Sequence, residues 1–149
     1  MTWYPRENYL KKIRDFYHET DIIKVITGVR RCGKSCLMET IANELKSSGI
    51  PSNHIYFFDL DSKDYHKITN PEQLEQLLES VPKVRGTKYL FIDEIQNVKD
   101  FELILNSFRR SNEWSIFITG SNSYLLSGEL MTKLTGRYIE FEMFPLSFE

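Results

Sequence analysis

One run of the sequence combines the residue types and the spacing that bind phosphate groups. Residues 28–35 read GVRRCGKS, so two glycines frame the run and Lys34 and Ser35 directly follow the second of them. Gly28 and Gly33 have no Cβ atom, and the backbone can therefore bring successive N–H groups close to phosphate oxygens. Lys34 supplies a positive charge to the β and γ phosphates, and the hydroxyl of Ser35 is a ligand for Mg²⁺. We predict a phosphate-binding loop, with nucleotide contacts from Gly28, Val29, Arg30, Arg31, Cys32, Gly33, Lys34, Ser35 and Cys36.

A second run places two acids directly after an apolar segment. The residues 89–92, YLFI, are followed by Asp93 and Glu94. A buried strand that ends in aspartate is how phosphate-loop ATPases hold Mg²⁺ opposite the loop serine. We therefore predict that Asp93 binds Mg²⁺ together with Ser35. Glu94 is predicted to be the catalytic base, which orients and deprotonates the water that attacks the γ phosphate.

Polar residues also follow two other predicted strands, and their roles stay open. Asp59 and Asp61 end the apolar run 55–58, where they either reach the metal site or the attacking water, or form a solvated turn. Ser121 and Asn122 follow the run 114–119 and either sense the γ phosphate or form a turn and a helix cap. Asn122 is included among the predicted nucleotide contacts.

Arg137 is an isolated cation that precedes the last predicted strand. A guanidinium group beside a γ phosphate stabilises the charge of the transition state, and the same chain or a neighbouring one can supply it. The alternative for Arg137 is a structural salt bridge. We predict a catalytic role for Arg137 beside Lys34 and Glu94, and whether it acts within its own chain stays open.

Alternating helical and strand patterns surround these residues and predict an α/β domain. The β-branched run 22–27 reads as a buried strand before the loop, and apolar residues recur at three and four positions after it, as on one helix face. Arg109 and Arg110 are expected to stabilise the carboxyl end of a helix through its dipole. We expect strands at 22–27, 55–58, 88–92, 114–119 and 139–143, and helices at 8–18, 37–45, 71–81, 101–110 and 125–134.

Length and composition fit one domain over residues 1–149. The chain has 41% hydrophobic residues, enough for one substantial core, and a formal net charge of −2. That charge gives no overall electrostatic reason to bind nucleic acid or an anionic membrane. The sequence has no apolar run typical of a signal peptide or a membrane span, so we expect a cytoplasmic protein whose two cysteines are thiols. Its three histidines show no metal-ligand spacing.

Taken together, the loop 28–35, the block 89–96 and the segments 118–122, 134–138 and 144–148 resemble prokaryotic AAA-type ATPases related to the archaeal predicted ATPases. The resemblance implies a three-layer P-loop NTPase core, with a mainly parallel five-stranded sheet in the order 5-1-4-3-2, preceded by an amino-terminal helix. It also implies ATP and Mg²⁺ as cofactors, with Lys34 on ATP, Ser35 and Asp93 on Mg²⁺, and Glu94 as the catalytic glutamate. Gly136 and Arg137 are similar to the place where such ATPases carry an arginine finger.

Members of that family are usually longer, with a carboxyl-terminal region that contacts nucleic acid or regulates the ATPase. We therefore expect residues 1–149 to be the amino-terminal part of a longer protein. The expected partners are ATP, further copies of the chain that exchange an arginine, and a carboxyl-terminal domain or protein partner. Nucleic acid stays open as a partner, and no membrane is expected.

The leading functional hypothesis is Mg²⁺-dependent ATP hydrolysis that changes the conformation of an attached domain or partner. The alternative is an ATP-binding regulatory or interaction module that does not hydrolyse ATP. A GTPase is disfavoured because the run 97–100, NVKD, has the wrong order for guanine recognition and directly follows the acidic strand end. A small-molecule phosphotransferase is weakened because no lid for an acceptor substrate is recognisable.

Overall fold

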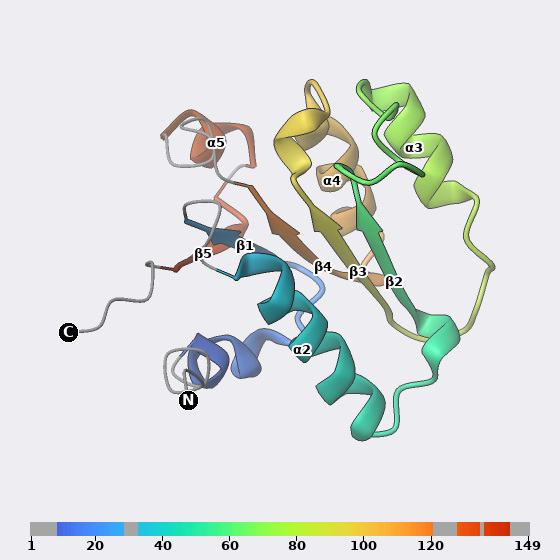
Figure 1. Ribbon diagram of the computed structural model, residues 1–149, viewed down its shortest axis with the longest axis vertical. Coiled ribbons are helices and arrows are strands. Elements are labelled where there is room, and N and C mark those ends of the chain that lie inside the picture. Colours follow the sequence, from blue (N-terminus) through green and yellow to red (C-terminus); the bar gives the residue numbers. More distant parts are fainter. Residues whose placement is uncertain (1–8, 29–32, 121–127, 135, 144–149) are drawn as a thin grey trace.

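A parallel five-stranded sheet forms the centre of the protein (Figure 1). The structure is a computed structural model that describes residues 9–28, 33–120, 128–134 and 136–143. All four pairs of neighbouring strands are parallel, and their order is β2-β3-β4-β1-β5. Read from the other edge, this is the predicted order 5-1-4-3-2. The strands are β1 (Ile23–Thr27), β2 (Ile55–Asp59), β3 (Lys88–Asp93), β4 (Trp114–Thr119) and β5 (Tyr138–Glu142).

Helices cover both faces of the sheet and give three layers. The segment 9–13 and α2 (Lys34–Ser47) pack on one face, whereas α3 (Pro71–Glu79), α4 (Phe101–Arg110) and α5 (Gly128–Lys133) pack on the other (Figure 1). The predicted amino-terminal helix is shorter than expected, because the α-helix ends at residue 13 and the 3-10 turn η1 (Arg14–Phe16) follows. Two further 3-10 turns are η3 (Ser52–His54) and η4 (Ile95–Asn97). None of the helices among the described residues combines the length and the apolar character needed to cross a membrane.

Alternation along the strands divides the core into two clusters. In β3, Leu90 and Ile92 face the α3–α4 side, whereas Tyr89 and Phe91 face the α2 side. Burying both faces is typical of parallel sheets, and it explains why these strands read as continuous apolar runs. Phe57, Phe91 and Phe117 stack across three strands on the α2 side, with ring centroids 5.9 and 4.7 Å apart.

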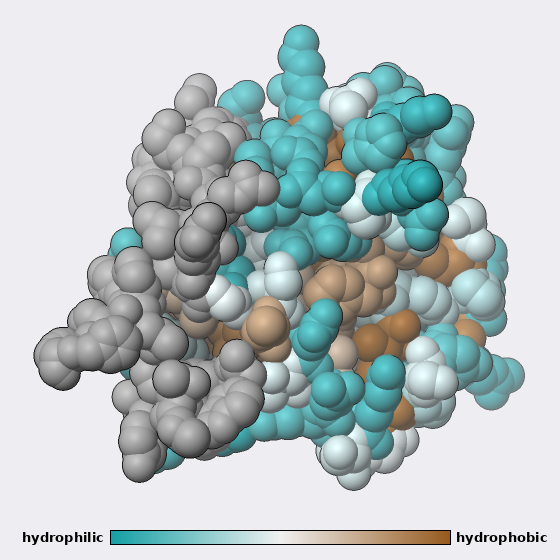
Figure 2. All heavy atoms as spheres, viewed as in Figure 1, coloured by the Kyte–Doolittle hydropathy of each residue, from teal (hydrophilic) through white to brown (hydrophobic). Residues whose placement is uncertain are grey.

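The edge strand β2 is covered less completely than the central strands. Four of its five residues are only half-buried, whereas every residue of β3 and β4 is buried. Figure 2 shows apolar side chains at the surface between α2 and β2. The central strands therefore form the fully buried part of the sheet, and the carboxyl ends of β3 and β4 carry residues of the candidate site.

Candidate functional site

The first glycine of the predicted loop lies directly after β1 and is pressed against the end of β5. Gly28 has φ +143°, and a Cβ atom there would lie 2.5 Å from the carbonyl oxygen of Met143. The N–H of Met143 donates to the carbonyl of Thr27 at 2.8 Å, which holds the two segments together. Glycine is therefore required at position 28 both by conformation and by space.

The second glycine begins the helix that follows the loop. Gly33 has φ +80° and is the N-cap of α2 without a side-chain hydrogen bond to the first helical turn. That first turn contains no acidic residue, and the N–H groups and the positive dipole at the amino end of a helix favour an anion. This is a 14-residue helix aimed at the loop.

Lys34 is buried at the start of α2, and its side chain contacts Gly28. It is the first residue of α2, only 3% of its surface is exposed, and its Nζ donates to the carbonyl of Gly28 at 3.2 Å. The Lys34 side chain thus reaches from the start of α2 back to the first glycine, and it places a positive charge next to Gly28.

The structure brings Ser35 and Asp93 into contact, although 58 residues separate them in the sequence. The Ser35 hydroxyl donates a hydrogen bond to Oδ2 of Asp93. Asp93 is the last residue of β3 and is 4% exposed. A serine hydroxyl and a carboxylate are both oxygen ligands of the kind that Mg²⁺ prefers.

Thr119 connects the predicted metal ligand with the predicted base. It is fully buried at the end of β4, the strand that lies between β3 and β1. Its hydroxyl donates to Oδ1 of Asp93 and accepts a hydrogen bond from the backbone N–H of Glu94 at 3.2 Å. Sequence reasoning missed Thr119, because a threonine within a β-branched strand reads as an ordinary strand residue. Its place before Gly120, at the carboxyl end of a central strand, was the available signal.

Glu94 follows Asp93 in a strained backbone conformation. Its φ of 61° and ψ of 51° lie in the left-handed region, which is uncommon for a residue with a side chain. The turn η4 follows directly, and within it the Gln96 amide Nε2 donates to Oε1 of Glu94 at 2.6 Å. No sequence pattern assigned a role to Gln96. Strain of this kind persists only where the surrounding structure supports it, and it is frequent at functional sites.

These residues fit Mg²⁺ bound together with a nucleotide phosphate. No three His, Cys, Asp or Glu side chains within the described ranges gather closely enough to form a metal cage of their own. Mg²⁺ does not need such a cage, because it is usually held by one or two carboxylates together with substrate phosphates and water. Ser35 and Asp93 provide protein oxygens, and the α2 end and Lys34 provide the groups that attract a phosphate.

Several predicted contacts lie outside the described residues or have other partners. Outside are Val29, Arg30, Arg31, Cys32, Ser121 and Asn122. Asp59 lies beside Asp93 in the β2–β3 register, but its Oδ1 accepts the N–H of Asp61 at 2.9 Å. The Asp61 carboxylate accepts from Asn97 Nδ2 at 3.0 Å. These contacts support the turn interpretation of both aspartates.

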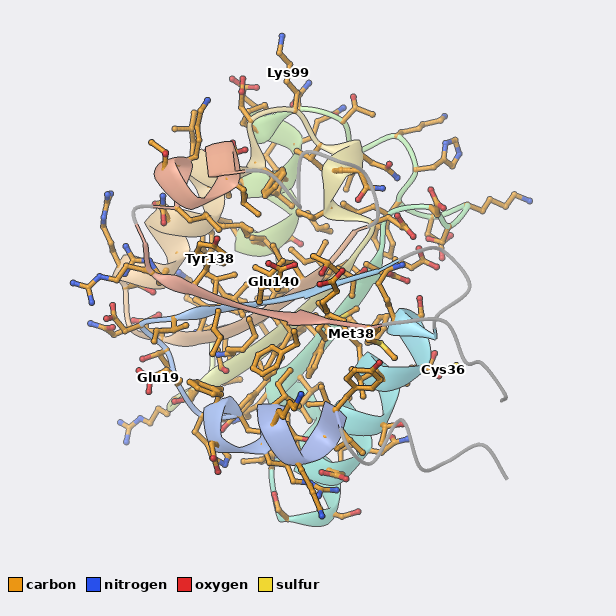
Figure 3. All side chains as sticks on the ribbon, turned by 90° about the vertical axis from the view of Figure 1, so that its left-hand side faces the viewer. Glu19, Cys36, Met38, Lys99, Tyr138 and Glu140 are labelled. Carbon is orange, nitrogen blue, oxygen red and sulfur yellow. The ribbon has the colours of Figure 1, made fainter. Side chains whose placement is uncertain are left out.

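Cys36 and Met38 occupy opposite environments on α2. Cys36 is an exposed thiol in the first turn, whereas Met38 is fully buried between α2 and the sheet (Figure 3). The predicted contact of Cys36 with the nucleotide stays a prediction, and its place in the first helical turn also offers a backbone N–H.

Arg137 lies at the amino ends of β1 and β5, whereas the loop follows the carboxyl end of β1. Its carbonyl accepts the N–H of Ile23 at the start of β1, at 3.0 Å, whereas the loop follows the end of the same strand. Five residues of strand separate the two levels, which corresponds to roughly 16 Å. At this separation we expect a catalytic role of Arg137 to be directed at a neighbouring chain, and that role stays a prediction.

The guanidinium group of Arg137 shares one carboxylate with Arg109. Arg137 Nη1 donates to Oδ2 of Asp21 at 3.0 Å, and Arg109 Nη1 donates to Oδ1 at 2.8 Å. Arg109 is buried, whereas 58% of the Arg137 side chain is exposed. Arg109 thus does more than interact with the helix dipole, because it fixes Asp21 beneath the amino end of β1.

Comparison with known sequences places these features in a wider group. A family model described as "AAA domain" matches residues 20–149. An uncharacterized protein of Haemophilus influenzae is 44% identical over 145 residues, which cover 97% of this chain and 36% of that protein. An uncharacterized protein of Methanocaldococcus jannaschii is 38% identical over 128 residues, which cover 85% of this chain and 27% of that protein. The chain thus spans only about a third of the length of these relatives.

A solved structure shares the fold at low sequence identity. The structure of C. elegans PCH-2 superposes with a TM-score of 0.56 and 17% identity, covering 95% of this chain and 40% of that one. At this identity the similarity shows the arrangement of strands and helices alone.

Proposed function

The chain belongs to the AAA domain family, and from this premise we propose that it binds ATP with Mg²⁺ and hydrolyses it. The observation that carries the proposal is the contact between Ser35 and Asp93 beside the buried Lys34. Two motifs that are far apart in the sequence meet here as a hydroxyl, a carboxylate and an ammonium group. This combination suits a nucleotide phosphate and a hard divalent cation.

Each residue has a distinct task in the proposed site. Lys34 and the amino end of α2 bind the phosphates through charge and N–H donors, which is the usual role of a helix terminus after a glycine-rich loop. Ser35 and Asp93 hold the metal ion, which when bound neutralises charge on the phosphates. Glu94 accepts the proton of the attacking water, and Thr119 keeps Asp93 and the Glu94 backbone in a fixed relation.

We further propose that hydrolysis is transmitted to an attached region or partner. Support comes from the contact of Gly28 with the backbone of Met143, since movement of the loop would directly displace the end of β5. The relatives continue well beyond the part that this chain matches, so a longer protein provides a place for the response. We propose that the protein uses the ATP and Mg²⁺ of the cytoplasm.

A titration of ATP binding with and without Mg²⁺ tests the proposal. We expect Mg²⁺ to strengthen ATP binding to the wild-type protein and to have much less effect on Asp93→Asn, which keeps the side-chain shape but loses the charge. Asp61→Asn is the matched control, because it removes a carboxylate from the neighbouring turn. Equal Mg²⁺ dependence in Asp93→Asn would contradict the assignment. ATP binding without turnover would favour the alternative of a module that does not hydrolyse ATP.

A further inference from the structure

The turn after β3 contains a side-chain contact that has no part in the tasks assigned so far. Gln96 lies in the middle of η4, and its Nε2 donates to Oε1 of Glu94 at 2.6 Å. A hydrogen bond this short to a carboxylate is typical of the charge-assisted kind, which is stronger than a bond between neutral groups. Gln96 therefore restrains the side chain to which we assign the base.

The rest of the turn fixes the position of Gln96 itself. Ile95 at the start of η4 is fully buried, and Val98, the residue after η4, is 1% exposed, so the turn is packed into the core on both sides. The Asn97 N–H donates to the Glu94 carbonyl at 3.1 Å, and the Asn97 side chain reaches Asp61 on the neighbouring turn. The backbone of Gln96 is thus held from both sides, and its amide contacts Glu94 from this packed turn.

The oxygen of the same side-chain amide is in an unfavourable environment. Oε1 of Gln96 is buried and has no hydrogen-bond partner, the only such side-chain atom in the described part of the chain. The amide cannot be turned over to satisfy Oε1, because a carboxylate accepts hydrogen bonds and Nε2 must then face Glu94. A buried acceptor without a partner costs stability, and in native proteins it calls for an explanation.

We propose that Gln96 is a positioning residue, which holds the Glu94 carboxylate in the orientation that accepts a proton from the attacking water. This inference rests on the proposed hydrolytic function. A glutamate side chain rotates about several bonds, and fixing it costs conformational entropy. The hydrogen bond from Gln96 fixes the Glu94 side chain during folding, and Oε1 of Gln96 is left without a partner. The base is then oriented before the nucleotide arrives, and such preorganisation increases the rate of the chemical step.

The test compares Gln96→Met with Gln76→Met. Methionine keeps the length of glutamine but cannot donate, and Gln76 is an exposed residue of α3 that serves as the matched control. We expect Gln96→Met to lower kcat by about 10-fold to 100-fold, with the ATP Kd unchanged within about twofold. Gln76→Met is expected to match the wild type in both quantities. Unchanged kcat in Gln96→Met would overturn the positioning role, as would a loss of ATP binding in proportion to kcat.

A second measurement uses the protein without nucleotide. Urea unfolding of Glu94→Met, Gln96→Met and the double variant forms a cycle that isolates the contact between the two side chains. We expect the effect of Gln96→Met on stability to differ between the wild-type and Glu94→Met backgrounds, whereas additive effects would overturn the contact. If the wild-type protein shows no turnover at all, the proposed hydrolysis fails and the positioning role fails with it. If the wild type turns over and Gln96→Met matches it, the positioning role alone fails.

Discussion

The hydroxyl of Ser35 donates a hydrogen bond to the carboxylate of Asp93, and this contact joins the first turn of α2 to the end of β3. Asp93 is nearly inaccessible to solvent, and Thr119 satisfies its other carboxylate oxygen. A buried carboxylate requires such partners. In the proposed function, Ser35 and Asp93 would hold the metal ion.

Replacement of Gly28 by alanine is predicted to destabilise the protein and to impair nucleotide binding. The added Cβ would lie 2.5 Å from the Met143 carbonyl oxygen, which is a backbone atom that cannot simply rotate away. We expect Gly28→Ala to lower the free energy of unfolding by about 1–3 kcal/mol more than Gly49→Ala. Gly49 also has positive φ, at +108°, but a Cβ atom added there would meet no heavy atom within 4 Å. Equal destabilisation of the two variants in urea unfolding would rule out the predicted collision.

Removal of the Thr119 hydroxyl is predicted to weaken both stability and turnover. Thr119→Val keeps the branched shape but leaves Oδ1 of Asp93 and the N–H of Glu94 without this partner. The expected loss in unfolding free energy is about 1–3 kcal/mol, because buried polar groups are left unsatisfied. Thr40→Val is the control, since the Thr40 hydroxyl donates to the carbonyl of Cys36 within α2 and not to Asp93. A Thr119→Val protein as stable and as active as Thr40→Val would show that the bridge has no role.

The stability of the protein is predicted to rise with pH because of Lys24. Burial lowers the pKa of Lys24 from 10.5 to about 7, an effect that the nearby Glu19 charge partly opposes. Between these values the folded chain has lost the Lys24 proton while the unfolded chain still carries it. Raising the pH therefore favours the folded state in this range and has no such effect below it.

Urea unfolding of wild type and Lys24→Met at about pH 6 and about pH 9 measures this contribution. We expect the unfolding free energy of the wild type, relative to that of Lys24→Met, to be larger at about pH 9 than at about pH 6. Lys46→Met, at an exposed position of α2, should show no such gain. If wild type and Lys24→Met differed in unfolding free energy by the same amount at both pH values, the predicted titration would be contradicted.

If Arg137 acts on a neighbouring chain, two inactive variants are predicted to restore activity when mixed. Arg137→Ala keeps an intact ATP site, and Lys34→Ala keeps an intact Arg137. Mixed assemblies would combine the two, so turnover should exceed the sum of the separate proteins. Arg137→Ala should barely change stability, because its ion pair with Asp21 is more than half exposed on the arginine side. Absence of any recovery in the mixture would remove Arg137 from the mechanism.

The sequence predicts the sheet well because each central strand is buried on both faces. Such strands read as continuous apolar runs, and β3 and β4 begin at the expected residues, Lys88 and Trp114. The strand order came from the family resemblance, since hydrophobic patterns do not determine which strands pair. The helix expected at 8–18 is too long, because its periodic apolar residues continue into a 3-10 turn that fills the same core cluster.

The site was predictable only where a residue acts through its place in a motif. Lys34, Ser35 and Asp93 lie where glycine-rich loops and strand ends put them. The role of Gln96 was not predicted, because its contact with Glu94 depends on a left-handed backbone conformation that no sequence pattern indicates. The catalytic role of Arg137 stays a prediction. Asp93 ends a strand and lies at the carboxyl ends of the parallel strands, where the loop follows β1, whereas Arg137 precedes a strand and lies at their amino ends.

The most direct test of the central claim compares ATP binding and turnover of wild type, Lys34→Ala and Glu94→Gln. We expect Lys34→Ala to lose ATP binding, because the positive charge beside Gly28 is gone. Glu94→Gln should bind ATP like the wild type but turn over at least about 100-fold more slowly, because the amide cannot accept the proton. Turnover by Glu94→Gln at the wild-type rate would contradict the assigned base and the proposed hydrolytic site.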